Sequence, residues 1–211
     1  MLPRNMIEID IDPYLLGGIS WHGLFSFIGV IIAVFFVARW APYRGVSSDT
    51  IYSIAIWAIL GGFIGARIVH VVDNWGDIYS QRPSQIVAVW NGGIGVWGGI
   101  LGGFAGGLIY VAIARVPKEH WGILMDLTAP ALLLAQTIGR LGDFANGEHC
   151  AKAASHFLSM TWTHPASLAR SCANGHSSSV NSSVEPVILY EIIWNCIVLA
   201  ILWLTRGRLK P

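Results

Sequence analysis

The chain has 211 residues, of which 54% are hydrophobic and only 12% are charged, and its formal net charge is +1. Soluble domains carry about 25% charged residues, so this composition indicates a protein whose surroundings are largely lipid. The 10 tryptophans and 24 glycines agree, because both residue types are enriched in membrane proteins. The low net charge points to no nucleic-acid partner, and the three cysteines form no Cys-x-x-Cys motif.

Five stretches of the chain are long and apolar enough to cross a bilayer as helices, which takes about 20 mostly apolar residues. They are residues 19–38, 51–72, 94–114, 121–138 and 187–205. We therefore predict an all-α polytopic membrane protein with about five transmembrane helices, in which residues 1–211 form a single transmembrane domain. The N-terminus is acidic and lacks a basic region before an apolar core, so it does not look like a cleavable signal peptide.

Basic residues in the connections give the orientation, because they concentrate on the cytoplasmic side of a membrane. Seven of them share one side: Arg39, Arg44, Arg115, Lys118, Arg206, Arg208 and Lys210. We predict that this side is cytoplasmic, so that the N-terminus is extracytoplasmic and the C-terminal end of this chain is cytoplasmic. Residues 139–186 then form a small extracytoplasmic cap between the fourth and fifth spans. Cys150 and Cys172 lie in this oxidising compartment, where they either pair or stay as two unpaired small residues.

The third span is rich in glycine. Residues 92–107 contain nine glycines, many of them three or four positions apart. Small residues at this spacing let helix backbones approach closely in lipid, and we favour this packing role. The alternative is a lipid-binding groove lined by exposed glycine backbone.

A polar cluster follows the fourth span, in the sequence GRLGDFANGEHC of residues 139–150. Its guanidinium, Arg140, can hold a lipid phosphate through two parallel charge-assisted hydrogen bonds. Acceptors and candidate bases follow it directly: Asp143, Asn146, Glu148 and His149. The cluster predicts an anion-binding site at the membrane surface. An interfacial arginine without a catalytic role is the alternative.

Ionisable residues inside the spans are functional candidates, because an arginine near a helix centre costs about 2.5–3.5 kcal/mol on insertion scales. Arg67 lies near the outer end of the second span, where it could simply reach toward the interface. Glu191 lies one turn into the last span, and pairing with Arg67 or Arg140 would satisfy its charge. The chain has no H-E-x-x-H, G-x-S-x-G or P-loop motif, which argues against a protease or an ATP-driven pump. We expect neither a metal site nor a cofactor.

The sequence resembles the prolipoprotein diacylglyceryl transferases of bacteria. GRLGDFANGEHC matches the family signature G-R-x-G-N/D-F-x-N-G-E at nearly every fixed place. Further matches follow the family's order over essentially the whole chain: SWHGLFSFIGV, GARIVHVVDNW, RPSQIVAVWNGGIGVWGG and PVILYE. The resemblance implies a multi-pass enzyme of the bacterial plasma (inner) membrane. It would transfer the diacylglyceryl group of phosphatidylglycerol to the lipobox cysteine thiol of preprolipoproteins, forming a thioether and releasing glycerol phosphate, as the first step of lipoprotein maturation.

The resemblance also implies roles for individual residues. Arg140 would hold the headgroup phosphate, and Asp143, Asn146 and Glu148 would complete the catalytic pocket. Other substrate-binding positions would be Arg67, Gly98, Gly99, Tyr190 and Glu191. The implied partners are phosphatidylglycerol, the signal-peptide and lipobox region of a preprolipoprotein, and the lipid bilayer.

The chain departs from the family pattern at two positions. Many relatives have His-Gly-Gly where this chain has Trp97-Gly98-Gly99, and many have a tyrosine where this chain has His22. We therefore expect His22 to take over part of the proton handling; an interfacial or packing histidine is the alternative. The sequence leaves the general base open, because geometry decides it before pKa does. The candidates are His22, Asp143, Glu148, His149 and Glu191.

Family members continue into two more helices, so seven spans are expected of a full member. We expect this chain to be a fragment of a longer protein; the alternative is a protein that lacks part of the usual active site. The alternative function is a non-catalytic phospholipid-binding or lipid-moving membrane protein. Such a protein would keep Arg140 and the glycine-rich span, but it would not need Asn146 and Glu148 so close to the arginine. A small transporter would show inverted repeats, which the two halves of the sequence lack.

Overall fold

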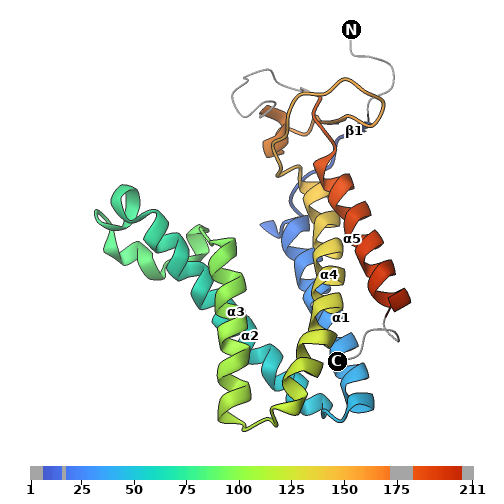
Figure 1. Cartoon of the computed structure of the whole chain (residues 1–211). Coiled ribbons are helices and arrows are strands. Elements are labelled where there is room, and N and C mark those ends of the chain that lie inside the picture. The colour runs from blue at the N-terminus through green and yellow to red at the C-terminus, as the bar shows by residue number, and fades with distance from the viewer. Residues whose placement is uncertain (1–6, 16–17, 172–182, 206–211) are drawn as a thin grey trace. The chain divides into compact units, whose positions relative to one another are not determined.

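The computed structural model describes residues 7–15, 18–171 and 183–205. These residues include five helices that are long and apolar enough to cross a membrane (Figure 1). They are α1 (Trp21–Trp40), α2 (Ser48–Asp73), α3 (Val96–Ile113), α4 (Glu119–Asn146) and α5 (Val187–Thr205). The predicted helical membrane fold with five spans is confirmed. Three of the basic residues used for orientation, Arg206, Arg208 and Lys210, lie outside the described residues.

The chain divides into two compact units. One unit is Met1–Phe36 with Thr128–Pro211, and the other is Val37–Leu127. That the two units act as a single transmembrane domain stays a prediction.

In the unit Val37–Leu127, helices α2 and α3 pack backbone against backbone. A Cβ at Gly65 would lie 2.3 Å from the carbonyl oxygen of Gly98, and a Cβ at Gly102 would lie 2.3 Å from that of Gly61. Side chains at these positions would force the helices apart, so the close approach requires glycine. The packing role predicted for the glycines of the third span is confirmed at these positions. At Gly99, by contrast, the nearest atom would be 3.8 Å away.

Three short helical turns connect α2 to α3. A π-helical turn, η3 (Trp75–Tyr79), follows α2, and two 3₁₀ turns, η4 (Pro83–Val87) and η5 (Val89–Asn91), lead toward α3. Such short turns satisfy few of their own backbone groups, so their carbonyls need other hydrogen-bond donors.

In the other unit, α1 and α4 also approach closely at glycines. A Cβ at Gly29 would lie 2.7 Å from the carbonyl oxygen of Ala135, and a Cβ at Gly142 would lie 2.7 Å from the Cα of His22. These two contacts lie seven residues, or about two turns, apart along each helix. The helices therefore run alongside each other, and the first turn of α1 meets the end of α4.

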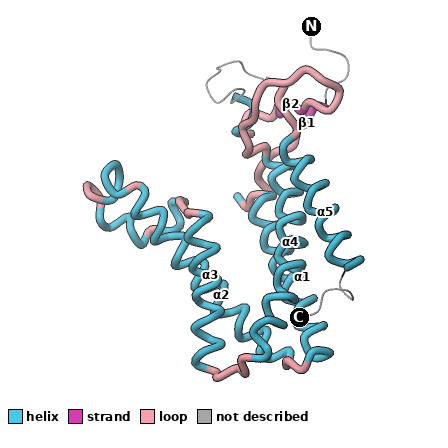
Figure 2. The backbone as a smooth tube through the Cα atoms, in the orientation of Figure 1, coloured by secondary structure: helices cyan, strands magenta, loops and turns pink. Residues whose placement is uncertain are grey.

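A small cap covers this end of the unit. Strand β1 (Ile7–Ile9) lies beside β2 (Met160–Trp162) in the cap (Figure 2), and the two strands pair in parallel. Met160 also forms an antiparallel bridge with Val184. Their side chains form a buried core with Ala169 and Ile188. Because Ile188 belongs to α5, this core anchors the cap to that helix.

The cysteines of the cap can be followed only in part. Cys150 is disulfide-bonded, and Cys196 on α5 is free and exposed. Cys172 lies outside the described residues, so its pairing stays a prediction.

Candidate active site

The signature sequence forms the end of helix α4. The helix continues to Asn146, two turns beyond the expected end of the span, so Arg140, Asp143 and Asn146 project from helical backbone. Gly147 ends the helix with a φ of +62°, and a Cβ there would lie 2.5 Å from the ring of Trp162. A left-handed backbone and tight packing together require glycine at this position.

Asp143 is the centre of the site. Its side chain is only 3% exposed, and its two carboxylate oxygens have different partners. Oδ1 contacts Nδ1 of His22 on α1, while Oδ2 accepts a hydrogen bond from Nη1 of Arg140 at 2.6 Å. Burying a charged carboxylate costs free energy unless the group is paired and hydrogen-bonded, as it is here. Asp143 therefore bridges the histidine and the arginine.

Arg140 is held on two of its three nitrogens. Besides Asp143, Nη1 donates to Nε2 of His149 at 2.9 Å, and Nε forms an ion pair with Glu191 of α5. The pairing of Glu191 with Arg140, one of the two partners expected for it, is confirmed. No described residue accepts a hydrogen bond from Nη2, and the side chain is 22% exposed. One edge of a fixed guanidinium is therefore left for an anion.

Asn146 connects the end of α4 to the first turn of α1. Its Oδ1 accepts a hydrogen bond from the backbone N–H of His22 at 3.3 Å, and its Nδ2 donates to Glu148. The His22 N–H lies in the first turn of α1, where backbone donors lack partners within the helix. Asn146 is buried, so it fixes both His22 and Glu148 with little freedom to move.

The structure thus brings together most of the residues singled out in the sequence. We call them the α4-end cluster: His22, Arg140, Asp143, Asn146, Glu148, His149 and Glu191. The hydroxyl of Tyr190 instead donates a hydrogen bond to the Glu185 carboxylate at 3.1 Å. Arg67, Gly98 and Gly99 belong to the other unit.

Sequence reasoning missed the link between the cap and α5. Glu185 hydrogen-bonds with Nε2 of His156 at 3.0 Å, in addition to Tyr190. The His156 hydrogen bond holds the pKa of the Glu185 carboxyl below its ordinary value, against the opposing effect of desolvation. An acidic residue just before a proline that opens a helix is a signal that could have identified Glu185.

Arg67 packs inside its unit, and that its side chain reaches toward the membrane interface stays a prediction. It is buried, and its guanidinium turns back to donate to five backbone carbonyls of the α2–α3 connection. The acceptors are the carbonyl oxygens of Gln85, Ile86, Ala88, Gly92 and Gly93. The guanidinium also lies 5.5 Å from the ring centre of Tyr79. One side chain thus satisfies the carbonyls that these short turns leave free.

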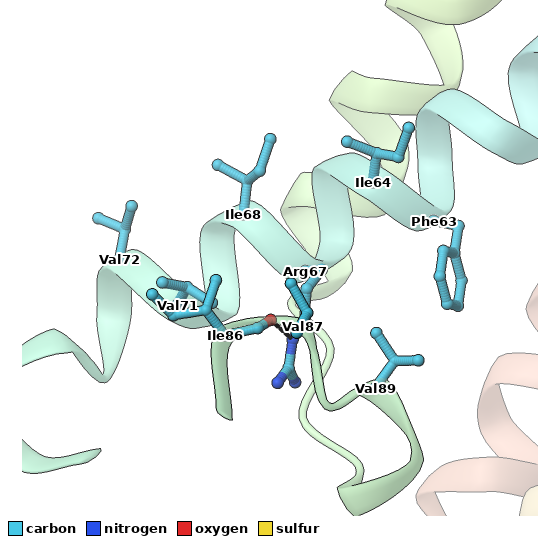
Figure 3. A pocket seen from close by; sticks show the side chains of 9 residues that line it. All are labelled: Phe63, Ile64, Arg67, Ile68, Val71, Val72, Ile86, Val87 and Val89. Atoms are coloured by element: carbon cyan, nitrogen blue, oxygen red, sulfur yellow. Dashed lines mark hydrogen bonds between the residues drawn. The ribbon is translucent and has the colours of Figure 1, made fainter. Parts of the chain in front are cut away.

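A cavity of about 380 Å³ lies beside Arg67, between α2 and the connection (Figure 3). Its other lining residues are all apolar: Phe63, Ile64, Ile68, Val71, Val72, Ile86, Val87 and Val89. The nitrogens of Arg67 are occupied by carbonyls, so this cavity offers apolar contact and no free charge.

Three residues of the α4-end cluster could also hold a divalent cation. Ligand atoms of His22, Asp143 and Glu148 lie within 4.8 Å of one another. Asp143 is already paired with Arg140, whose charge would oppose a cation. The expectation that the protein needs no metal stays a prediction.

The described residues define a multi-pass membrane protein with a charged, partly buried site where α1, α4 and α5 meet. Comparison with known proteins identifies the class further. The family model for prolipoprotein diacylglyceryl transferase matches residues 14–211. The chain belongs to this family, and it is therefore a membrane transferase of lipoprotein biosynthesis.

Similar proteins named phosphatidylglycerol–prolipoprotein diacylglyceryl transferase occur in several bacteria. The Lactobacillus johnsonii protein is 33% identical over 208 residues, which cover 98% of this chain and 70% of that protein. The Limosilactobacillus reuteri protein is 34% identical over 206 residues, covering 96% and 72%. The protein of Staphylococcus aureus strain Newman is 34% identical over 205 residues, covering 95% and 70%. This chain thus spans about 70% of the length of these relatives.

Proposed function

We propose that Arg140 binds the phosphate of phosphatidylglycerol while its diacylglyceryl group is transferred to the lipobox cysteine of a preprolipoprotein. The observation that carries this proposal is that two nitrogens of the Arg140 guanidinium are held in place while the third is left for a ligand. Nε and Nη1 are fixed by Glu191, Asp143 and His149, whereas Nη2 has no partner among the described residues. A preorganised donor needs no reorientation when charge develops on a bound anion.

The chemistry of the transfer requires such a donor. The cysteine sulfur forms a bond with the terminal glyceryl carbon of the lipid, and the bond between that carbon and the phosphate oxygen breaks. The phosphodiester carries one negative charge, whereas the glycerol phosphate that leaves approaches two. Arg140 stabilises this added charge as the bond breaks.

The acceptors of the α4-end cluster suit the remaining part of the headgroup. Glu148 is about one-third exposed and is oriented by Asn146, so its carboxylate can accept hydrogen bonds from the glycerol hydroxyls. Glu191 restrains Arg140, and Tyr190 precedes it on α5 at the rim. These roles distinguish a glycerol headgroup from a headgroup that carries no hydroxyl.

Residues of the Val37–Leu127 unit have supporting roles in this proposal. Arg67 keeps the α2–α3 connection in place through its five carbonyl contacts. Gly98 lets α3 pack on α2, and the more open surface at Gly99 contributes to substrate binding.

The same proposal includes the orientation. The N-terminus and the cap are extracytoplasmic, and the C-terminal end of the chain is cytoplasmic, in the plasma membrane of a bacterium. The parallel pairing of β1 with β2 supports placing the N-terminus and the cap on one side, because four spans lie between the two strands and an even number returns the chain to the same side. The basic residues in the connections favour the other side as the cytoplasmic one. Modification of single-cysteine variants at Glu8 and at Lys118 by a membrane-impermeant reagent in intact cells would test it, with only the first expected to react.

A transfer assay in detergent tests the phosphate role. It uses labelled phosphatidylglycerol and a lipobox peptide with the chain as it stands, Arg140→Ala, Arg140→Lys and a control, Arg39→Ala. We expect Arg140→Ala to lower kcat/KM by about 10²–10³-fold. Arg140→Lys should remain strongly impaired, because an ammonium lacks the planar fork of donors.

Two outcomes would contradict the proposal. Full transfer by Arg140→Ala would remove the phosphate role of this residue. Phosphatidylglycerol binding without any transfer, both by the unmutated chain and by a version extended to the natural stop codon where the gene continues, would instead indicate a non-catalytic lipid binder.

A further inference from the structure

We infer that Nε2 of His22 accepts the proton of the substrate thiol, and that Asp143 is the positioning residue that orients the imidazole. This inference rests on the proposed function, because it concerns the nucleophile of the same transfer. It assigns one base among the five candidates that the sequence left open.

The contact with Asp143 determines which ring nitrogen is free. Nδ1 of His22 faces Oδ1 of a carboxylate that has no proton of its own to donate beside Arg140, so Nδ1 carries the ring proton. Nε2 is then the lone-pair nitrogen, and no described residue hydrogen-bonds with it. The His22 side chain is 45% exposed, so a substrate atom can reach Nε2.

The position of the ring is fixed as well as its tautomer. The His22 backbone N–H donates to Asn146, and its Cα lies against Gly142. The imidazole is thus restrained at its backbone and at Nδ1, with only Nε2 directed away from these contacts. A base that is held in this way is preorganised for proton transfer.

The other candidates are occupied or chemically less suitable. Asp143 is 3% exposed and uses both oxygens, His149 Nε2 accepts from Arg140, and Glu191 pairs with Arg140. Glu148 is the strongest competitor, because its Oε2 lies 3.9 Å from His22 Nδ1 and is not bonded to Asn146. Ordinary pKa values are about 8.5 for a thiol, 6.5 for an imidazole and 4.3 for a glutamate, so the imidazole is the better match to the thiol.

The charges around His22 favour the product of proton transfer. Among the residues that the structure describes, the charged groups that face it come from the end of α4 and the residues that follow. They are the carboxylates of Asp143 and Glu148, and the guanidinium of Arg140 behind Asp143. Two anions against one more distant cation stabilise an imidazolium at this place.

The transfer moves one proton and two electron pairs. The S–H proton passes to Nε2, and the sulfur electron pair forms the C–S bond with the glyceryl carbon. The C–O bond to phosphate breaks, and its electron pair stays on the phosphate oxygen beside Arg140. The imidazolium then returns its proton to the released glycerol phosphate or to water, which regenerates the neutral base.

The test compares transfer to a cysteine peptide with transfer to the same peptide containing selenocysteine. A selenol is already largely ionised at neutral pH, so it does not need the base. We expect His22→Gln to lower kcat/KM for the cysteine peptide by about 10²–10⁴-fold. The selenocysteine peptide should restore transfer to within a few-fold of wild type. Phosphatidylglycerol binding by His22→Gln, measured with labelled lipid, should be unchanged and reports that the variant is folded.

The pH profile gives a second readout. The wild-type rate should fall at acidic pH as an imidazole becomes protonated, whereas His22→Gln should lack this limb and rise with pH as the thiol ionises by itself. Asp143→Asn should keep the limb and move it to lower pH, because the imidazolium loses its anionic partner. His120→Gln, in the other unit, serves as the control histidine variant and should behave as wild type.

The inference is overturned if His22→Gln transfers to the cysteine peptide at the wild-type rate. It is equally overturned if the loss is the same for both peptides, because that would indicate a structural role. Either result would leave the phosphate role of Arg140 intact, provided that Arg140→Ala still lowers kcat/KM by the expected amount. Full activity of Arg140→Ala would instead count against the proposed function alone.

Discussion

Gly142 lies directly against the backbone of His22. A Cβ at Gly142 would lie 2.7 Å from both the Cα of His22 and the carbonyl oxygen of Trp21. The missing side chain lets the first turn of α1 rest on the end of α4, and Asp143, the next residue along the chain, then reaches the imidazole. The geometry of the α4-end cluster therefore depends on the lack of a side chain at Gly142.

We predict that Gly142→Ala damages both stability and activity. The added methyl must displace backbone rather than a flexible side chain, which should cost about 1–3 kcal/mol of unfolding free energy. It should also separate His22 from Asp143 and lower kcat/KM at least about tenfold, since general-base catalysis is worth about 10²–10⁴-fold. Thermal unfolding in detergent and the transfer assay measure the two effects.

Gly139→Ala is the matched control for this variant. It lies three residues earlier on α4, and its Cβ would meet only Oγ of Ser26 at 3.6 Å, an ordinary contact. We expect nearly wild-type behaviour. Equal kcat/KM values for the two variants would show that transfer does not depend on the close approach at Gly142.

The α2–α3 interface gives a second prediction. Gly65→Ala would place a Cβ 2.3 Å from the carbonyl oxygen of Gly98, so we expect a loss of about 1–3 kcal/mol in unfolding free energy. Gly107→Ala, whose nearest neighbour would be Ile54 at 3.5 Å, should leave stability close to wild type. Denaturant titration in detergent measures both, and similar midpoints would argue against backbone packing between these helices.

Arg67→Lys tests the role of the guanidinium in the α2–α3 connection. A lysine ammonium cannot reach five carbonyls spread over Gln85–Gly93, so most of them would lose their donor. We expect amide hydrogen exchange in residues 83–95 to accelerate at least about tenfold, because local opening becomes easier. Exchange in the cap serves as the internal control, and unchanged exchange in residues 83–95 would refute this role.

The Glu185–His156 contact predicts a pH-dependent difference in stability. The pKa of Glu185 is lowered in the folded state, so its contribution is present above the pKa of the unfolded chain and is lost as pH falls through the lower folded value. Glu185→Gln should therefore lower Tm most above about pH 5, and the difference from wild type should shrink below about pH 4. Glu8→Gln, an exposed carboxylate on β1, is the control. A difference in Tm that does not vary with pH would contradict the contact.

Much of this architecture could be predicted from hydrophobic length alone. The sequence predicts the last span at the residues that form α5, and it predicts that Glu191 pairs with one of two arginines. The extension of α4 to Asn146 could not be predicted, because polar residues in a helix end look like a loop until their partners are known. The His22–Asp143 contact joins residues 121 apart in sequence, and no local pattern encodes it. The contacts of Arg67 with backbone carbonyls could not be predicted either, because every residue has a carbonyl and the sequence does not show which of them accept a hydrogen bond.

The parallel pairing of β1 with β2 also has a consequence for biosynthesis. Ile7 leaves the ribosome well before its partner Met160, which is made only after four membrane helices have been synthesised. Until then the N-terminal strand has no edge to pair with, and the buried side of Ile9 has no core to enter. Contacts of such large sequence separation form late in folding. The pairing of β1 with β2 is therefore among the last contacts of this unit to form, so a protein released before that point would carry the α4-end cluster without the strand that completes the core of its cap.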